Sequence, residues 1–141
     1  MKTLALLISL LITALIANAQ DTESVTLTVT IENVQSNEGQ ILAELHTQDT
    51  FMRGPGIQQF MSNAKTGSIS FVFEDVKPGT YAISTMHDIN ENQQMDYDYL
   101  GMPSEKYGMS NNERSMGPPT FEDAQFEVAE ENLEINIRFI R

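Results

Sequence analysis

The sequence contains no cysteine and no tryptophan, and only 8 of its 141 residues are lysine or arginine. Without cysteine the chain forms no disulfide, binds no metal through thiolates and carries no lipid on a cysteine. The 8 basic residues stand against 20 acidic ones, which gives a formal net charge of −12. This charge repels nucleic acids and anionic lipids, and no cluster of basic residues offsets it. We therefore expect no nucleic-acid partner and look for cations instead.

The N-terminus has the pattern of a signal peptide over residues 1–19. Lys2 precedes an apolar run from Leu4 to Ile16, and Ala17-Asn18-Ala19 forms a small-residue cleavage site. A transmembrane anchor is the rival interpretation, but the run is short for a bilayer and polar residues follow it. No second run of spanning length follows, so we expect a periplasmic or secreted protein without membrane insertion after cleavage. Loss of the leader and Lys2 would leave 122 residues, 20–141, with a net charge of −13.

Several segments of the remaining chain alternate between apolar and polar residues with a period of two, which is typical of half-buried strands. The clearest runs from Val25 to Ile31. Turn-forming residues separate the strands, so we predict hairpins over residues 24–47, 68–87 and 124–139. Residues 49–66 predict an irregular segment, with a short helix over 56–63 as the alternative.

These strands predict an all-β fold in a single domain over residues 20–141. About 6–8 short strands with polar turns favour an antiparallel β-sandwich, immunoglobulin-like or prealbumin-like. Residues 88–120 are rich in Asn, Asp, Gly and Pro and lack periodicity. Long loops of this kind are usually functional or ordered by a bound partner, so we expect the function to reside there.

The strongest local motif in this loop is a series of oxygen-bearing side chains at alternate positions. With Asp88 as position one, Asn90, Asn92 and Asp96 fall at positions three, five and nine, and Gln94 would add its main-chain carbonyl at position seven. Ca²⁺ prefers six or more oxygen ligands arranged in this way along a wrapped chain. The sequence therefore predicts a Ca²⁺ site of Asp88, Asn90, Asn92, Gln94 and Asp96.

The motif departs from the usual Ca²⁺ loop at two positions. Gln93 stands where glycine normally permits a sharp turn, and Tyr99 stands where a bidentate glutamate is usual. Asp98 or Glu91 would be the substitutes for the missing carboxylate. Because Asp and Asn are also common in turns, a loop without a cation is the alternative.

Little in the sequence favours catalysis. His46 and His87 are the only histidines, and we expect both to be structural, with His87 bonded to loop backbone. No serine has the context of a nucleophile elbow. The alternative to a binding module is an envelope enzyme acting on a glycan or peptide through the loop carboxylates and His87, which requires His87, Asp96 or Asp98, and Tyr107 to converge. We expect the loop tyrosines to pin the loop to the sandwich.

An ordered series of motifs resembles one bacterial family of exported proteins, catalogued as domain of unknown function 2141. The motifs are Pro78-Gly79-Thr80-Tyr81, His87-Asp88-Ile89-Asn90-Glu91-Asn92, Leu100-Gly101-Met102-Pro103, Tyr107-Gly108-Met109-Ser110 and Gly117-Pro118-Pro119-Thr120-Phe121. The resemblance covers nearly all of the chain after the leader. It implies a secreted or periplasmic β-sandwich without established activity, and a loop of the form His-Asp-x-Asn-x-Asn-Gly with a later Asp. The Pro-Gly-Thr-Tyr turn is also similar to prealbumin-like and carboxypeptidase-regulatory-like sandwiches, a likeness of fold alone.

Together these patterns predict an exported, non-enzymatic accessory or binding module. Its partner would be an envelope or extracellular protein or glycan. Ca²⁺ is the cofactor that the loop predicts.

Overall fold

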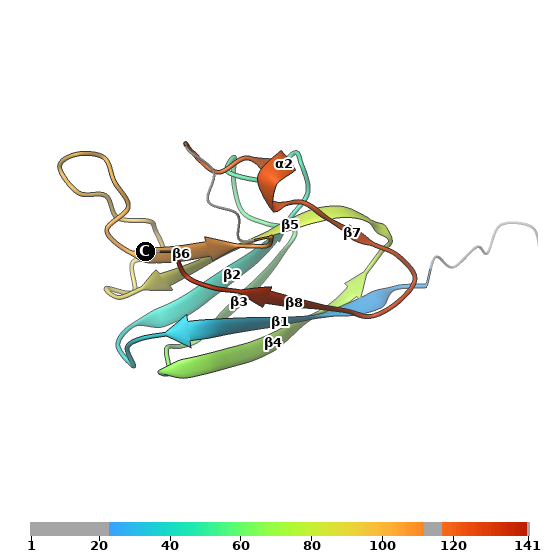
Figure 1. Ribbon diagram of the computed structural model, residues 1–141, viewed down its shortest axis with the longest axis horizontal. Helices are drawn as coiled ribbons and strands as arrows, with labels where there is room; N and C mark the ends of the chain where they lie inside the picture. Colours follow the sequence, from blue (N-terminus) through green and yellow to red (C-terminus); the bar gives the residue numbers. More distant parts are fainter. Residues whose placement is uncertain (1–22, 112–116, 141) are drawn as a thin grey trace, which may run out of the picture.

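The computed structural model describes residues 23–111 and 117–140, so the predicted leader lies outside the described residues. Figure 1 shows two layers of strands with the short helix α2 (Phe121–Ala124) at their edge. The elements are β1 (Val25–Val34), β2 (Gln40–His46), β3 (Gln58–Asn63), β4 (Gly67–Val76), β5 (Gly79–Asp88), β6 (Lys106–Met109), α2 (Phe121–Ala124), β7 (Phe126–Val128) and β8 (Leu133–Ile137).

The strands form two sheets that pack face to face. One sheet has the order β4-β1-β8, and the other has the order β3-β2-β5-β6 with β7 paired to β5. All neighbouring strands are antiparallel except β1 and β8, which are parallel. The predicted all-β sandwich is confirmed, and its eight strands agree with the expected number.

The three predicted hairpins are wrong, although their strands exist. β1 pairs with β4 and β8, not with β2; β5 pairs with β2, not with β4; and β7 and β8 belong to different sheets. In each case the connection crosses from one sheet to the other. Alternation identifies the face of a strand that is buried, but it carries no information about the neighbour with which the strand pairs.

Two further strands lie where the sequence predicted none. Residues 58–63, expected to be irregular or helical, form the edge strand β3, which pairs with β2 from Gln40↔Asn63 to Leu45↔Gln58. The sequence of β3 is mostly polar, and the ring of Phe60 stacks on the ring of Phe71 with 3.9 Å between their centroids. The short strand β6 interrupts the predicted 88–120 loop. Weakly alternating edge strands give little periodic signal, which explains both omissions.

The core lies between the two sheets and contains the predicted inward-facing residues. Leu27, Val29 and Ile31 of β1 are fully buried, and Ile41 and Leu45 of β2 face them from the other sheet. Full burial of such a side chain stabilises the fold by about 1.5–3 kcal/mol. The apolar core therefore supplies the stability of this cysteine-free domain.

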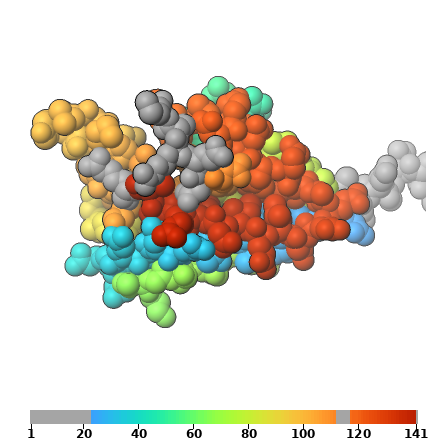
Figure 2. All heavy atoms as spheres, viewed as in Figure 1, coloured from blue at the N-terminus to red at the C-terminus, as the bar shows by residue number. Residues whose placement is uncertain are grey.

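The connection between β5 and β6 projects from one end of the sandwich. Figure 1 shows it as the gold loop at the left, and Figure 2 shows that it stands clear of the body of the molecule. Among the described residues, no helix has the length and apolar character needed to span a membrane. The projecting loop contains the predicted Ca²⁺ ligands.

Candidate functional site

We call residues 88–105 the acidic loop. It starts at Asp88, the last residue of β5, and returns at Glu105, directly before β6. The antiparallel register pairs His87 with Lys106, so Asp88 and Glu105 lie at the same end of this ladder. The two strands thereby bring together two carboxylates that are 17 positions apart in the sequence.

Asp88 is fully buried and anchors the start of the loop. Its carboxylate accepts hydrogen bonds from the backbone N–H groups of Asn92 (3.2 Å) and Gln93 (2.7 Å) and from Gln40 Nε2 (2.9 Å). Burial alone would raise the pKa of this carboxyl, but the bonds from Gln40, Gln93 and Asn92 together lower the pKa below its ordinary value. Asp88 is therefore held as an anion inside the loop.

Asn90, Asn92 and Asp96 complete a turn around Asp88. The side-chain oxygens of Asn90 and Asn92 accept the N–H groups of Asn92 (3.2 Å) and Gln94 (2.9 Å), respectively. Their amide nitrogens lie 2.6 Å and 3.2 Å from the Asp96 carboxylate. Four of the predicted ligands therefore belong to one hydrogen-bonded turn.

Gln93 occupies the glycine position without breaking the turn. Its φ is +60°, which is the left-handed conformation that glycine adopts easily and other residues adopt at a cost of about 1 kcal/mol or more. Its N–H still reaches Asp88. The departure from the motif therefore introduces backbone strain, but the loop keeps its path.

Glu105 is the carboxylate that the sequence did not reveal. It is 6% exposed, and its two oxygens accept the N–H groups of Ile89 (2.9 Å) and Asp96 (3.5 Å). Burial raises the pKa of Glu105, and the negative charges of Asp88 and Asp96 raise it further against the lowering effect of the two hydrogen bonds. A prediction of β6 and of its register would have placed Glu105 beside Asp88.

The two suggested substitutes, Asp98 and Glu91, do not occupy this place. Asp98 Oδ1 accepts the N–H groups of Leu100 (2.8 Å) and Met102 (3.0 Å) and closes a separate turn. Glu91 is exposed at a φ of +60°. The exposed Gln94 donates its N–H to Asn92, and its carbonyl oxygen has no hydrogen-bond partner among the described residues.

The acidic loop has a concentrated negative charge without a basic partner. Among the described residues, Arg138 pairs with Glu32 and the ring of His46 contacts Glu44, and neither contact involves the loop. The negative charges of Asp88 and Asp96 raise the pKa of Glu105, because like charges destabilise each other unless a cation or a proton offsets them. The loop is thus predisposed to take up positive charge.

The donor set fits a hard cation better than a transition metal. Within the described part of the chain, no three His, Cys, Asp or Glu side chains converge closely enough to hold a metal by themselves. Coordination would therefore need the amide oxygens of Asn90 and Asn92 and a main-chain carbonyl, the ligands that Ca²⁺ accepts. Both amide groups would have to rotate to turn oxygen instead of nitrogen towards the cation.

The side chain of His87 points into the core, on the face of β5 opposite to that of Met86. It is buried, its Nε2 is 2.8 Å from the carbonyl oxygen of Glu38, and its ring stacks on Phe139. Tyr107 is the cross-strand neighbour of Met86, so it faces away from His87. Among the described residues, His87 therefore does not converge with Tyr107 and the loop carboxylates, which is the arrangement that the enzyme alternative requires.

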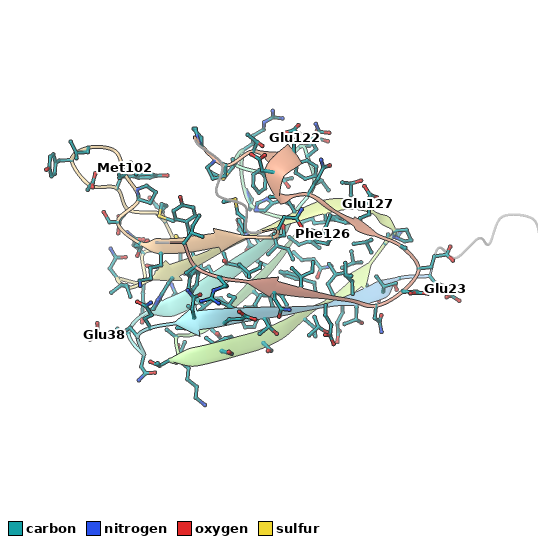
Figure 3. All side chains as sticks on the ribbon, viewed as in Figure 1. Glu23, Glu38, Met102, Glu122, Phe126 and Glu127 are labelled. Atoms are coloured by element: carbon teal, nitrogen blue, oxygen red, sulfur yellow. The ribbon has the colours of Figure 1, made fainter. Side chains whose placement is uncertain are left out.

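The far end of the acidic loop, residues 97–102, is the loop tip. Tyr99 is 94% exposed, Leu100 is 71% exposed and Met102 is 49% exposed. Figure 3 shows Met102 on the part of the loop that projects from the sandwich. The expectation that the tyrosines pin the loop is therefore wrong for Tyr99, since its ring contacts little but solvent.

The model of a family described as "Uncharacterized protein conserved in bacteria (DUF2141)" matches residues 29–136. The match spans both sheets and the acidic loop, and it confirms the resemblance found from the motifs. No curated protein and no solved structure matches the chain.

Proposed function

The chain belongs to the uncharacterized bacterial family DUF2141, and from its own residues we propose that it is an exported, non-enzymatic binding module whose acidic loop is ordered by Ca²⁺. The proposal places the protein in the periplasm or outside the cell, as the signal-peptide pattern predicts. The observation that carries it is the hydrogen-bonded turn of Asp88, Asn90, Asn92 and Asp96, held to β6 through Glu105, with which no lysine or arginine among the described residues is paired.

The ligands would be the predicted set with one addition. Asp88, Asn90, Asn92, Asp96 and the Gln94 carbonyl would wrap the cation, and Glu105 would supply the carboxylate that the motif lacks. Ca²⁺ tolerates six to eight oxygens in flexible geometry, whereas Mg²⁺ requires a near-ideal octahedron. A loop whose amide groups must rotate to bind suits the more tolerant ion.

The loop tip would be the contact surface for an envelope or extracellular protein or glycan. Its exposed Tyr99, Leu100 and Met102 form the kind of apolar patch that marks interaction sites. The tip begins at residue 97, directly after the proposed ligand Asp96, so it continues from the proposed Ca²⁺ site along the chain. Ca²⁺ would stabilise the base of the loop and so reduce the entropy lost when the tip binds.

The test measures Ca²⁺ affinity by calorimetry for three variants that each remove one negative charge. Asp96→Asn and Glu105→Gln change proposed ligands, whereas Asp98→Asn changes a carboxylate of the same loop that closes its own turn. We expect the first two to weaken binding about tenfold or more, and the third to change it less than threefold.

The control separates coordination from general attraction of cations to an acidic protein. If Asp98→Asn weakens Ca²⁺ binding as much as Asp96→Asn, the loop attracts cations only through net charge and the proposed site is wrong. The same conclusion follows if Mg²⁺ binds as tightly as Ca²⁺.

A further inference from the structure

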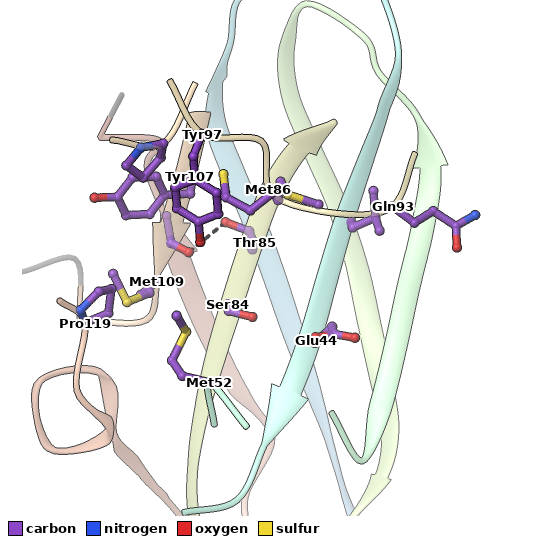
Figure 4. A pocket seen from close by; sticks show the side chains of 14 residues that line it. Glu44, Met52, Ser84, Thr85, Met86, Gln93, Tyr97, Tyr107, Met109 and Pro119 are labelled. Carbon is purple, nitrogen blue, oxygen red and sulfur yellow. Dashed lines mark hydrogen bonds between the residues drawn. The ribbon is translucent and has the colours of Figure 1, made fainter. Parts of the chain in front are cut away.

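A second candidate site lies on the outer face of the β3-β2-β5-β6 sheet, beside the acidic loop. It is a groove of about 360 Å³, within the range of small-molecule sites. Its floor consists of two cross-strand rows, Leu42–Met86–Tyr107 and Glu44–Ser84–Met109. The walls contain Met52, Gln93, Met95, Tyr97, Pro103 and Pro119, and Figure 4 shows the labelled side chains around the opening.

Methionine dominates the lining of this groove. Four of the eight methionines of the chain, Met52, Met86, Met95 and Met109, line it together with Tyr97. Methionine side chains are unbranched and polarizable, so they adapt to apolar ligands of different shapes. The groove can therefore accept an alkyl or aromatic group.

Glu44 is the one charged side chain among the described residues of the lining. Its Oε1 accepts a hydrogen bond from Gln59 Nε2 at 2.6 Å, and its Oε2 lies 3.4 Å from His46 Nε2. No lysine or arginine among the described residues pairs with it. An apolar groove with one uncompensated carboxylate favours a ligand with one positive charge.

His46 leaves this negative charge in place. The ring is buried beside Phe51, and desolvation lowers the pKa of His46 more strongly than the neighbouring Glu44 raises it. Because a carboxylate only accepts, the proton on Nε2 points to Glu44 and to Ser84 Oγ, which is 3.1 Å away. The other nitrogen faces the Thr50 hydroxyl at 3.2 Å, so the Ser84–His46 pair lacks the orienting carboxylate of a catalytic triad.

We propose that the groove binds a small lipophilic amine, with its apolar chain among Met86, Met95 and Met109 and its ammonium group at Glu44. The ammonium would donate hydrogen bonds to the Glu44 carboxylate and to Ser84 Oγ, which are neighbours across β2 and β5. None of the proposed Ca²⁺ ligands lines this groove, although the wall residues Gln93, Met95 and Tyr97 alternate with Asn92, Gln94 and Asp96 along the acidic loop.

The experiment uses octylamine, octanol and octanoate, three probes with the same alkyl chain and different charge. The protein carries ¹³C-labelled methionine methyl groups, and titrations are followed by NMR. We expect octylamine to shift the four groove methionines and to bind about tenfold more tightly than octanol, because hydrogen bonds to a charged group strengthen binding. Octanoate should bind more weakly than octanol. Met61, which is exposed on β3 beside Leu42 and does not line the groove, should shift less than the four groove methionines with every probe.

Glu44→Gln provides the decisive variant, with Glu74→Gln as its matched control on the other sheet. Glu44→Gln should reduce the affinity for octylamine to that for octanol, and Glu74→Gln should leave it unchanged. Equal loss in both variants would mean that net charge attracts the amine and would overturn the proposal. Unshifted groove methionines with all three probes would overturn it too. The Ca²⁺ affinity of Glu44→Gln should equal that of the unaltered protein, so the two proposals fail separately.

Discussion

The backbone at Gln93 offers a sharp test of how the acidic loop is built, through the substitution Gln93→Gly. A non-glycine residue at φ +60° costs about 1–2 kcal/mol, whereas glycine adopts this conformation freely. Glycine also increases the entropy of the unfolded chain, which opposes the gain by about 0.4–1 kcal/mol. The net expectation is a stabilisation of about 0.5–1 kcal/mol, with the hydrogen bond from its N–H to Asp88 retained.

The assay is thermal and urea unfolding, with Gln94→Gly as the matched control. Gln94 is the next residue and has a negative φ, so glycine there brings only the entropic cost of about 0.5–1 kcal/mol. We expect Gln93→Gly to raise the melting temperature by roughly 2–5 °C and Gln94→Gly to lower it by a similar amount. If both variants lower it equally, Gln93 is not strained and the described path of the loop is wrong.

Three further predictions concern stability. Because the pKa of His46 is lowered in the folded state, the unfolded chain binds the proton more readily. The stability due to the neutral ring is therefore lost as the pH falls below about 6.5. The difference in unfolding free energy between the unaltered protein and His46→Gln should shrink between pH 7.5 and pH 5.5, and a constant difference would contradict this prediction. Gly39→Ala should destabilise the fold by about 3 kcal/mol or more in urea unfolding, because the φ of Gly39 is +72° and a Cβ would lie 2.1 Å from the carbonyl oxygen of Asp88. Gly54→Ala is the control and should change the free energy of unfolding little, because no atom lies within 4 Å of a Cβ there. Tyr99→Ala should change the free energy of unfolding by less than about 0.5 kcal/mol, and a larger loss would show that the ring packs on the protein.

The sequence predicted the strands of the sandwich well because their alternation reports burial directly. Leu27, Val29 and Ile31 were expected on one face of a strand and are buried there. The pairing of the strands could not be predicted from this alternation, since β1 precedes β2 in the sequence but pairs with β4 and β8. Pairing depends on which sheet each strand joins, and this is decided by packing over the whole core.

The acidic loop shows the same division between local and distant information. The proximity of Asp88, Asn90, Asn92 and Asp96 followed from their spacing, because one turn of chain brings them together. Glu105 was missed because it reaches the turn through the β5–β6 register. The groove was missed for the same reason, since its floor is made by cross-strand neighbours on three strands.

The central claim is that Ca²⁺ orders the acidic loop, and the melting temperature of residues 20–141 tests it most directly. The protein would be heated in a chelator and then across a Ca²⁺ titration, with Mg²⁺ as the control ion. An ion that binds only the folded state stabilises it by about 2.7 kcal/mol at a hundred times its dissociation constant. The account predicts a saturable rise in melting temperature with Ca²⁺ and a much smaller one with Mg²⁺. An unchanged melting temperature in saturating Ca²⁺ would contradict it.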